Sequence, residues 1–119
     1  MSQQRTTQVL QRFNQAFVSH DPTLLEELLD QDCAVESADG SRYNGHDACL
    51  EFWSKLAADE LTKYEPEDIW IAGDRGVIRW RLHWGTSDED SVRGVHLMRQ
   101  RAGRILECQS YVKDHAQSL

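Results

Sequence analysis

The residues of this chain best suited to chemistry are its five histidines, and His96 is the most informative of them. A histidine side chain has an unperturbed pKa of about 6.5, so it can accept or donate a proton near physiological pH. His83 falls on the polar side of a predicted strand, and His46 stands beside Asp47 at the start of a predicted helix. The sequence therefore favours His96 as the candidate general acid or base.

Motifs that bind phosphates or metals are absent from the sequence. It contains no Gly-rich phosphate loop, no His-x-x-x-His pair, no Gly-x-Ser-x-Gly turn and no cluster of Cys and His. The cysteines Cys33, Cys49 and Cys108 are odd in number and far apart, as expected of reduced thiols used as small apolar fillers. We therefore expect no cofactor and no metal, and any chemistry would fall to side chains alone.

Length and charge exclude several classes of partner. The 119 residues suit one domain, and a net charge of −7 repels both a nucleic-acid backbone and an anionic lipid surface. No apolar run approaches the roughly 18 residues of a membrane span. The start, Met1 to Gln8, is polar where a signal peptide would be apolar. We expect a cytoplasmic protein that binds neither nucleic acid nor membrane.

The first half of the chain is predicted to be mainly helical. A helix ending near His20 is indicated by apolar residues at three- and four-residue spacings: Val9, Leu10, Phe13, Ala16 and Phe17. Asp21-Pro22 begins a short second helix with a buried stripe of Leu24, Leu25, Leu28 and Leu29. Cys33 to Ser37 is predicted to be a short strand, and Asn44-Gly45 precedes a third helix, His46 to Ala58.

The second half is predicted to be a meander of antiparallel strands. The first, Thr62 to Ala72, contains Pro66 and should be irregular and at an edge. Val77 to Trp84 alternates apolar and polar residues, and strands at Ser91 to Gln100 and Arg104 to Lys113 follow after turns. Three helices and then a meander predict one α+β domain, residues 1–119, whose curved sheet wraps the long first helix and leaves a conical space at its open end.

Several stretches of the sequence resemble the nuclear transport factor 2-like (NTF2-like) superfamily, in particular its SnoaL-like and ketosteroid-isomerase-like branches. The resemblance covers roughly Val9 to Lys113, and the segments that carry it are Phe13-x-x-Ala16-Phe17 with His20-Asp21, Asp32 to Glu36, Gly45 to Ala48 before Phe52-Trp53, Val92 to Arg99, Gly103 to Ile105, and Tyr111 to Lys113. It implies a cone-shaped, cystatin-like α+β fold with an apolar pocket, often dimeric through the sheet, but no single activity.

The catalytic groups known in this superfamily do not transfer intact. The steroid isomerases use a Tyr on the first helix, an acid on the penultimate strand and an Asp after the first short strand, where this chain has Phe13, His96 and Ser37. The Arg-x-Asp of the epoxide hydrolases is replaced by Gly94-Val95-His96. If His96 takes the position of the family's acid, the resemblance places it inside the cone.

We expect the cone to be a pocket for a small apolar or cyclic molecule. Its predicted lining, with His96 as the acid or base, is Phe13, Phe17, Ser37, Phe52, Trp53, Trp80, Trp84, Met98, Cys108 and Ser110. Each buried indole N–H would want an acceptor, which a ligand or water could supply. The other interpretation is that these rings fill a solid core and that His96 is a core histidine bonded to Ser110 or Ser37.

The sequence leaves two functions open. One is a cofactor-independent isomerase, cyclase or dehydratase in which His96 moves a proton and Ser37, Ser110 or an indole N–H orients a substrate oxygen. The other is a non-catalytic ligand-binding or dimerisation domain.

The outward face of the strands predicts a homodimer. It combines an apolar centre with charged margins, from Val77, Arg79, Arg81, Val95, Leu97, Arg99, Ile105, Glu107 and Tyr111. A solvated face covered by arginine stems, or a docking surface for a different protein, are the alternatives.

Overall fold

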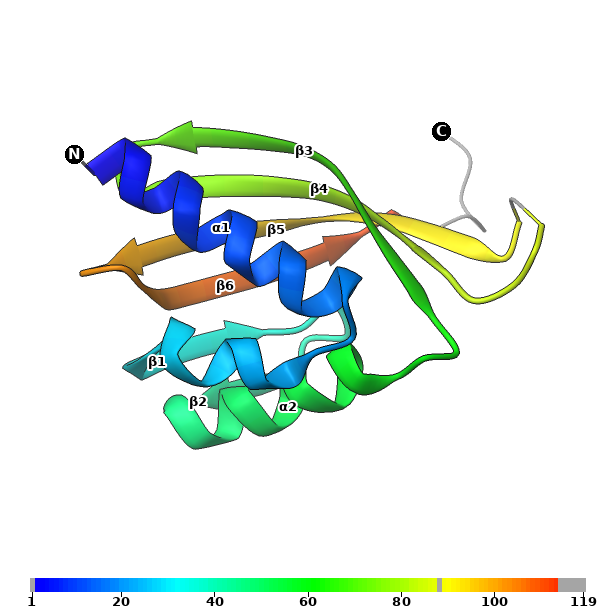
Figure 1. The fold of residues 1–119 in the computed structure, drawn as a ribbon, viewed down its shortest axis with the longest axis horizontal. Helices are drawn as coiled ribbons and strands as arrows, with labels where there is room; N and C mark the ends of the chain where they lie inside the picture. Colours follow the sequence, from blue (N-terminus) through cyan, green and yellow to red (C-terminus); the bar gives the residue numbers. More distant parts are fainter. Residues whose placement is uncertain (1, 88, 114–119) are drawn as a thin grey trace.

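A computed structural model describes residues 2–87 and 89–113, and its helices all lie on one face of a sheet (Figure 1). They are α1 (Ser2–Val18), the 3₁₀ helix η1 (Pro22–Leu28) and α2 (His46–Ala58). Asp21 caps η1 by accepting a hydrogen bond from the Thr23 N–H. The tighter 3₁₀ turn buries Leu25 and Leu28 but leaves Leu24 exposed, so the predicted four-leucine stripe is only partly correct.

The six strands form one curved, open sheet in the order β2-β1-β6-β5-β4-β3. They are β1 (Leu29–Glu36), β2 (Arg42–Asn44), β3 (Lys63–Ala72), β4 (Arg75–His83), β5 (Ser91–Arg101) and β6 (Arg104–Val112). The α+β class and the antiparallel meander from β3 to β6 are confirmed. The sheet is mixed, however, because β1 pairs with β6 in parallel, and the sequence did not predict β2.

The first long strand is irregular, as its proline predicted. The register of β3 against β4 shifts between Pro66 and Asp68, because proline has no N–H for the ladder. The resulting bulge bends β3 over the end of the sheet at which α1 and α2 end (Figure 1).

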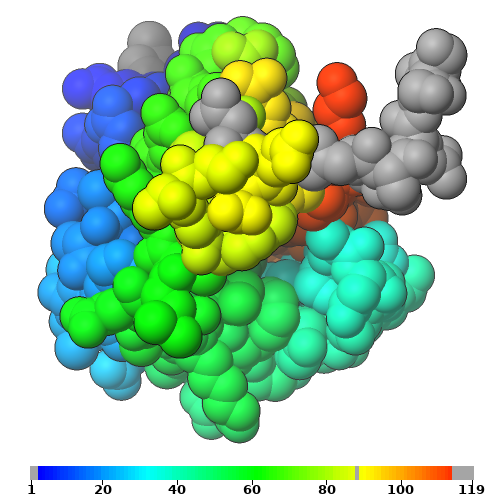
Figure 2. All heavy atoms as spheres, turned by 90° about the vertical axis from the view of Figure 1, so that its right-hand side faces the viewer, coloured from blue at the N-terminus to red at the C-terminus, as the bar shows by residue number. Residues whose placement is uncertain are grey.

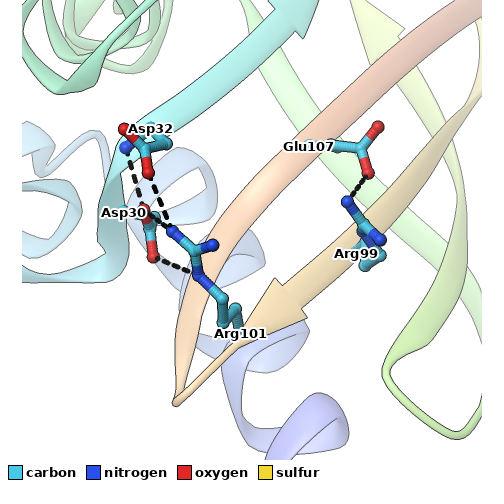
Figure 3. A network of polar contacts seen from close by, with 5 residues as sticks. All are labelled: Asp30, Asp32, Arg99, Arg101 and Glu107. Atoms are coloured by element: carbon cyan, nitrogen blue, oxygen red, sulfur yellow. Dashed lines mark hydrogen bonds and ion pairs between the residues drawn. The ribbon is translucent and has the colours of Figure 1, made fainter.

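An ion-pair cluster ties the end of β5 to β1. Arg101 Nη2 lies 2.8 Å from Asp30 Oδ1 and 3.1 Å from Asp32 Oδ2 (Figure 3). The hydrogen bond from Arg101 and the Asp32 backbone N–H hold the pKa of Asp30 below its usual value. Arg101 therefore holds β1 beside β6 at the point where their parallel pairing begins.

The core lies between α1 and the sheet. Leu10, Phe13 and Ala16 of α1 are fully buried against it, with Ile78 of β4 and Met98 of β5. No helix among the described residues is long and apolar enough to span a membrane.

Gly94 of β5 makes room for the ring of Trp80 on β4, its direct partner in the sheet. A Cβ at position 94 would lie 2.5 Å from Trp80 Cζ2 and 2.5 Å from the backbone oxygen of Tyr111. The Trp80 indole can therefore lie flat against the inner face of the sheet only if residue 94 is glycine.

We predict that Gly94→Ala lowers the free energy of unfolding by about 1–3 kcal/mol, the usual cost of overpacking. Urea unfolding measures the change, with Gln109→Ala, an exposed position on β6, as the control. Adding Trp80→Phe should recover part of the loss by removing the clashing indole atoms. A Gly94→Ala variant as stable as the wild type would contradict the close packing of Trp80.

Candidate functional site

A cavity of about 120 Å³ opens at the end of the molecule where α1 and α2 end and β3 begins. Figure 2 views this end, with the C-terminal part of α2 and the start of β3 in green and the β4–β5 hairpin in yellow. The inner wall is formed by five buried side chains: Phe17, Trp53, Tyr64, Trp80 and His96. The mouth is formed by more exposed side chains: His20, Leu56, Asp59, Thr62 and Leu82.

His96 lies at the base of the inner wall and is 9% exposed. Strand alternation points its side chain inward, opposite Ser110 on β6, and its Nδ1 lies 2.8 Å from Ser110 Oγ. Aromatic rings surround the imidazole, with ring centroids 5.1 Å away for Trp80, 5.4 Å for Phe13 and 6.4 Å for Tyr64. The ring therefore lies among aromatic faces, and the Ser110 hydroxyl is its one hydrogen-bond partner among the described residues.

Burial lowers the pKa of His96 to about 3, because the charged form loses its hydration and gains no anion in return. The imidazole is consequently neutral at physiological pH. A neutral imidazole can donate a hydrogen bond from one nitrogen and accept one at the other, but it is a poor proton acceptor when its pKa is so low.

Two further polar groups belong to the inner wall. The Tyr64 hydroxyl donates to Asn14 Oδ1 at 2.9 Å, and burial raises the pKa of this phenol. Trp80 Nε1 is buried and has no hydrogen-bond partner among the described residues. An unpartnered buried N–H costs about 1–3 kcal/mol, so a group that enters the cavity with an acceptor could repay this penalty.

The structure brings most of the predicted site residues to this region. Phe17, Trp53, Trp80 and His96 line the cavity, and Ser110 reaches it through its bond to His96. Phe13, Met98 and Cys108 are buried and lie outside the lining, in the core.

Three predicted residues lie elsewhere. Ser37 follows β1 and bonds to Asp39 in an exposed turn, and Phe52 stacks on Tyr43 of β2, with ring centroids 4.2 Å apart. Trp84 was expected inside, but β4 ends at His83 and the hairpin continues beyond the core, leaving Trp84 51% exposed. Strand alternation predicts which face a residue takes, and it does not predict where the core ends.

Sequence reasoning missed six of the cavity residues, and His20 and Tyr64 are the two of them that matter most for its chemistry. His20 follows the first helix, and only its place at a helix end, where the chain often needs a left-handed residue, could have marked it. Tyr64 lies on the irregular part of β3, where alternation is not a guide.

Within residues 2–87 and 89–113, no group of three or more His, Cys, Asp or Glu could hold a metal ion.

The sequence profile of the SnoaL-like domain matches residues 10–108. The chain belongs to the SnoaL-like domain family. An NTF2-like protein of unknown function from Mesorhizobium loti is 40% identical over 96% of this chain and 95% of its own, with a TM-score of 0.88. No match was found among the curated proteins.

More distant structures share the fold. A protein from Jannaschia sp. CCS1 that is proposed to be a SnoaL-like polyketide cyclase is 14% identical, covering 94% of this chain and 88% of its own, with a TM-score of 0.76. A protein with a ketosteroid isomerase-like fold from Catenulispora acidiphila, in complex with trimethylamine, is 20% identical over 87% and 83% of the two chains, with a TM-score of 0.71. SnoaL-like membership and the NTF2-like fold are thus established.

We predict that the free energy of unfolding depends on pH through His96. The pKa of His96 is lower in the folded state than in the unfolded state, so its contribution is complete above about pH 6.5 and is lost as the pH falls toward 3. Between pH 6 and 4 the wild type should lose up to about 1.4 kcal/mol per pH unit relative to His96→Gln.

Chemical unfolding of both proteins at several pH values measures this difference, and all other titrating groups cancel in it. Gln109→Ala, an exposed position on β6 that removes no titratable group, is the control and should follow the wild type. Parallel pH profiles for the wild type and His96→Gln would show that His96 titrates as it does in water.

Proposed function

We propose that this protein binds a small, uncharged, largely apolar molecule, about one ring in size, in the cavity between α1, α2 and the sheet. The observation that carries the proposal is the cavity's inner wall, in which four aromatic rings and a neutral imidazole surround a space of about 120 Å³. Such a lining binds apolar surface and offers few polar contacts.

The cavity volume supports a small ligand. Drug-sized ligands occupy pockets of about 300 Å³ or more, whereas an apolar cavity of about 150 Å³ in another protein holds benzene. At about 120 Å³ this cavity suits a single ring or a short branched chain, and not a steroid or a polyketide of several rings.

The polar groups support an uncharged ligand with an acceptor. His96 is neutral and Tyr64 is protonated, so no charge on the inner wall would compensate a buried ligand ion. Trp80 Nε1 is an unpartnered donor on a ring that lines the cavity. A carbonyl or ether oxygen of the ligand is the acceptor best suited to this indole N–H.

If the protein is an enzyme, we infer a cofactor-independent isomerisation, cyclisation or dehydration. In such a reaction His96 would not be the base, because its pKa lies far below neutral pH. When the Ser110 hydroxyl donates to Nδ1, the proton of the imidazole is on Nε2, and this N–H can stabilise negative charge that develops on a substrate oxygen. In the alternative, non-catalytic function, the same N–H only orients a bound ligand.

Fluorobenzene tests the binding proposal, because its ¹⁹F resonance and the fluorescence of Trp53 and Trp80 both report occupancy. We predict saturable binding to the wild type and at least tenfold weaker binding to Leu56→Trp, which fills the mouth of the cavity. Leu24→Trp adds the same side chain at an exposed position on η1 and should bind like the wild type. Absence of saturable binding to the wild type, or equal binding to both variants, would contradict the proposal.

We also propose a homodimer through the outer face of the sheet. Leu97 and Tyr111 are 39% and 52% exposed there, beside the Arg99–Glu107 ion pair (Figure 3). Contact with a second copy would cover the apolar groups of this face. Ile105, predicted on this face, is fully buried in the core because the register of β6 shifts beside it.

Light scattering after size exclusion tests this arrangement, with an expected mass twice that of the chain. Leu97→Asp should give a monomer, because it places a charge at the apolar centre of the face. Leu24→Asp, at an exposed leucine on η1, should remain dimeric. A monomeric wild type at about 100 μM would rule the dimer out.

A further inference from the structure

His20 occupies a backbone position that usually belongs to glycine. At the end of α1 the Asp21 N–H donates to the Ala16 carbonyl oxygen at 2.9 Å, and the His20 N–H donates to that of Phe17 at 3.4 Å. This pair of bonds is the Schellman motif, whose turn residue needs a left-handed conformation. His20 adopts it with φ of +54°, at a cost that glycine would avoid. Folding alone would favour glycine at this position, yet the chain has a histidine there.

The hydrogen bond of His20 determines its tautomer. Nδ1 lies 2.9 Å from the carbonyl oxygen of Ala57, in the last turn of α2. A carbonyl oxygen only accepts, so Nδ1 must carry the proton, and in the neutral ring Nε2 carries the lone pair. No hydrogen bond joins Nε2 to any of the described residues, which leaves this nitrogen available as an acceptor at the mouth of the cavity.

The other polar groups at the mouth are acceptors as well. The Thr62 hydroxyl donates its proton to the Asp59 carbonyl oxygen at 3.1 Å, so only its lone pairs are left. The Asp59 carboxylate is exposed and accepts a hydrogen bond from the Leu61 N–H. Among the described side chains that form the mouth, none offers a free hydrogen-bond donor, whereas the inner wall has an unpartnered donor in Trp80.

We propose that His20 Nε2 accepts a hydrogen bond from the ligand, so that the cavity selects small rings that carry an O–H or N–H donor directed at the mouth. The inference rests on the proposed function, because it names the chemical class of the molecule in the same cavity. Phenol is the simplest member of the class. Fluorobenzene has nearly the same size and shape and no donor. Because the phenol oxygen can also accept a hydrogen bond from Trp80 Nε1, loss of the phenol preference in His20 variants is what assigns that preference to His20.

The experiment compares the affinities of phenol and fluorobenzene by calorimetry and ¹⁹F NMR for the wild type, His20→Gly and His20→Asn. Glycine suits the left-handed turn, and asparagine tolerates it and can still donate to Ala57, so both variants should fold with little change in unfolding midpoint. His83→Asn is the matched control on the outer face, away from the cavity. Long-range ¹H–¹⁵N spectra of His20 report which nitrogen carries the proton.

We expect the wild type to bind phenol about tenfold more tightly than fluorobenzene, the effect of one good hydrogen bond. Both His20 variants should lose this preference, so that each of them binds phenol and fluorobenzene with equal affinity. Equal binding of the two probes to the wild type, or a phenol preference that survives in both variants, would overturn the inference while leaving the cavity intact. Failure of both probes to bind the wild type would overturn the proposed function and this inference with it.

Discussion

Burial of the His96 imidazole without a charged partner is the constraint on which the character of this cavity depends. Three aromatic rings surround it, and Ser110 Oγ is its hydrogen-bond partner. Because none of the described residues places an anion beside it, the ring stays neutral, and the inner wall of the cavity is uncharged at physiological pH. An uncharged aromatic wall selects apolar ligands through desolvation, and a single N–H or lone pair then decides their orientation.

The sheet makes this environment by placing one inward side chain from each of three neighbouring strands side by side. Tyr64, Trp80 and His96 come from β3, β4 and β5, and Gly94 provides the space in which the indole lies flat. The helices close the space from the other side, Phe17 at the end of α1 and Trp53 in α2. The mouth follows from the same geometry, since it lies where both helices end and where the His20 side chain contacts the last turn of α2.

Local patterns in the sequence predicted most of the fold and about half of the site. Helix spacing, turn residues and strand alternation depend on near neighbours, which is why α2, the meander and the inward side of β5 agree with prediction. The parallel pairing of β1 with β6 and the short β2 depend on distant contacts, so no local signal revealed them. Trp84 and Ser37 failed as site residues because alternation does not show where a core ends. His20 was overlooked because its role depends on α2, 37 residues further along the chain.

The central claim is that the space beside His96 is hollow, apolar and accessible. Crystallography under xenon pressure tests it most directly, because xenon enters dry apolar cavities and contributes strong anomalous scattering. The account predicts a xenon atom between the rings of Trp53, Tyr64 and Trp80, adjacent to a neutral His96 bonded to Ser110. Side chains that fill this space and admit no xenon, or an imidazole turned to solvent, would contradict it.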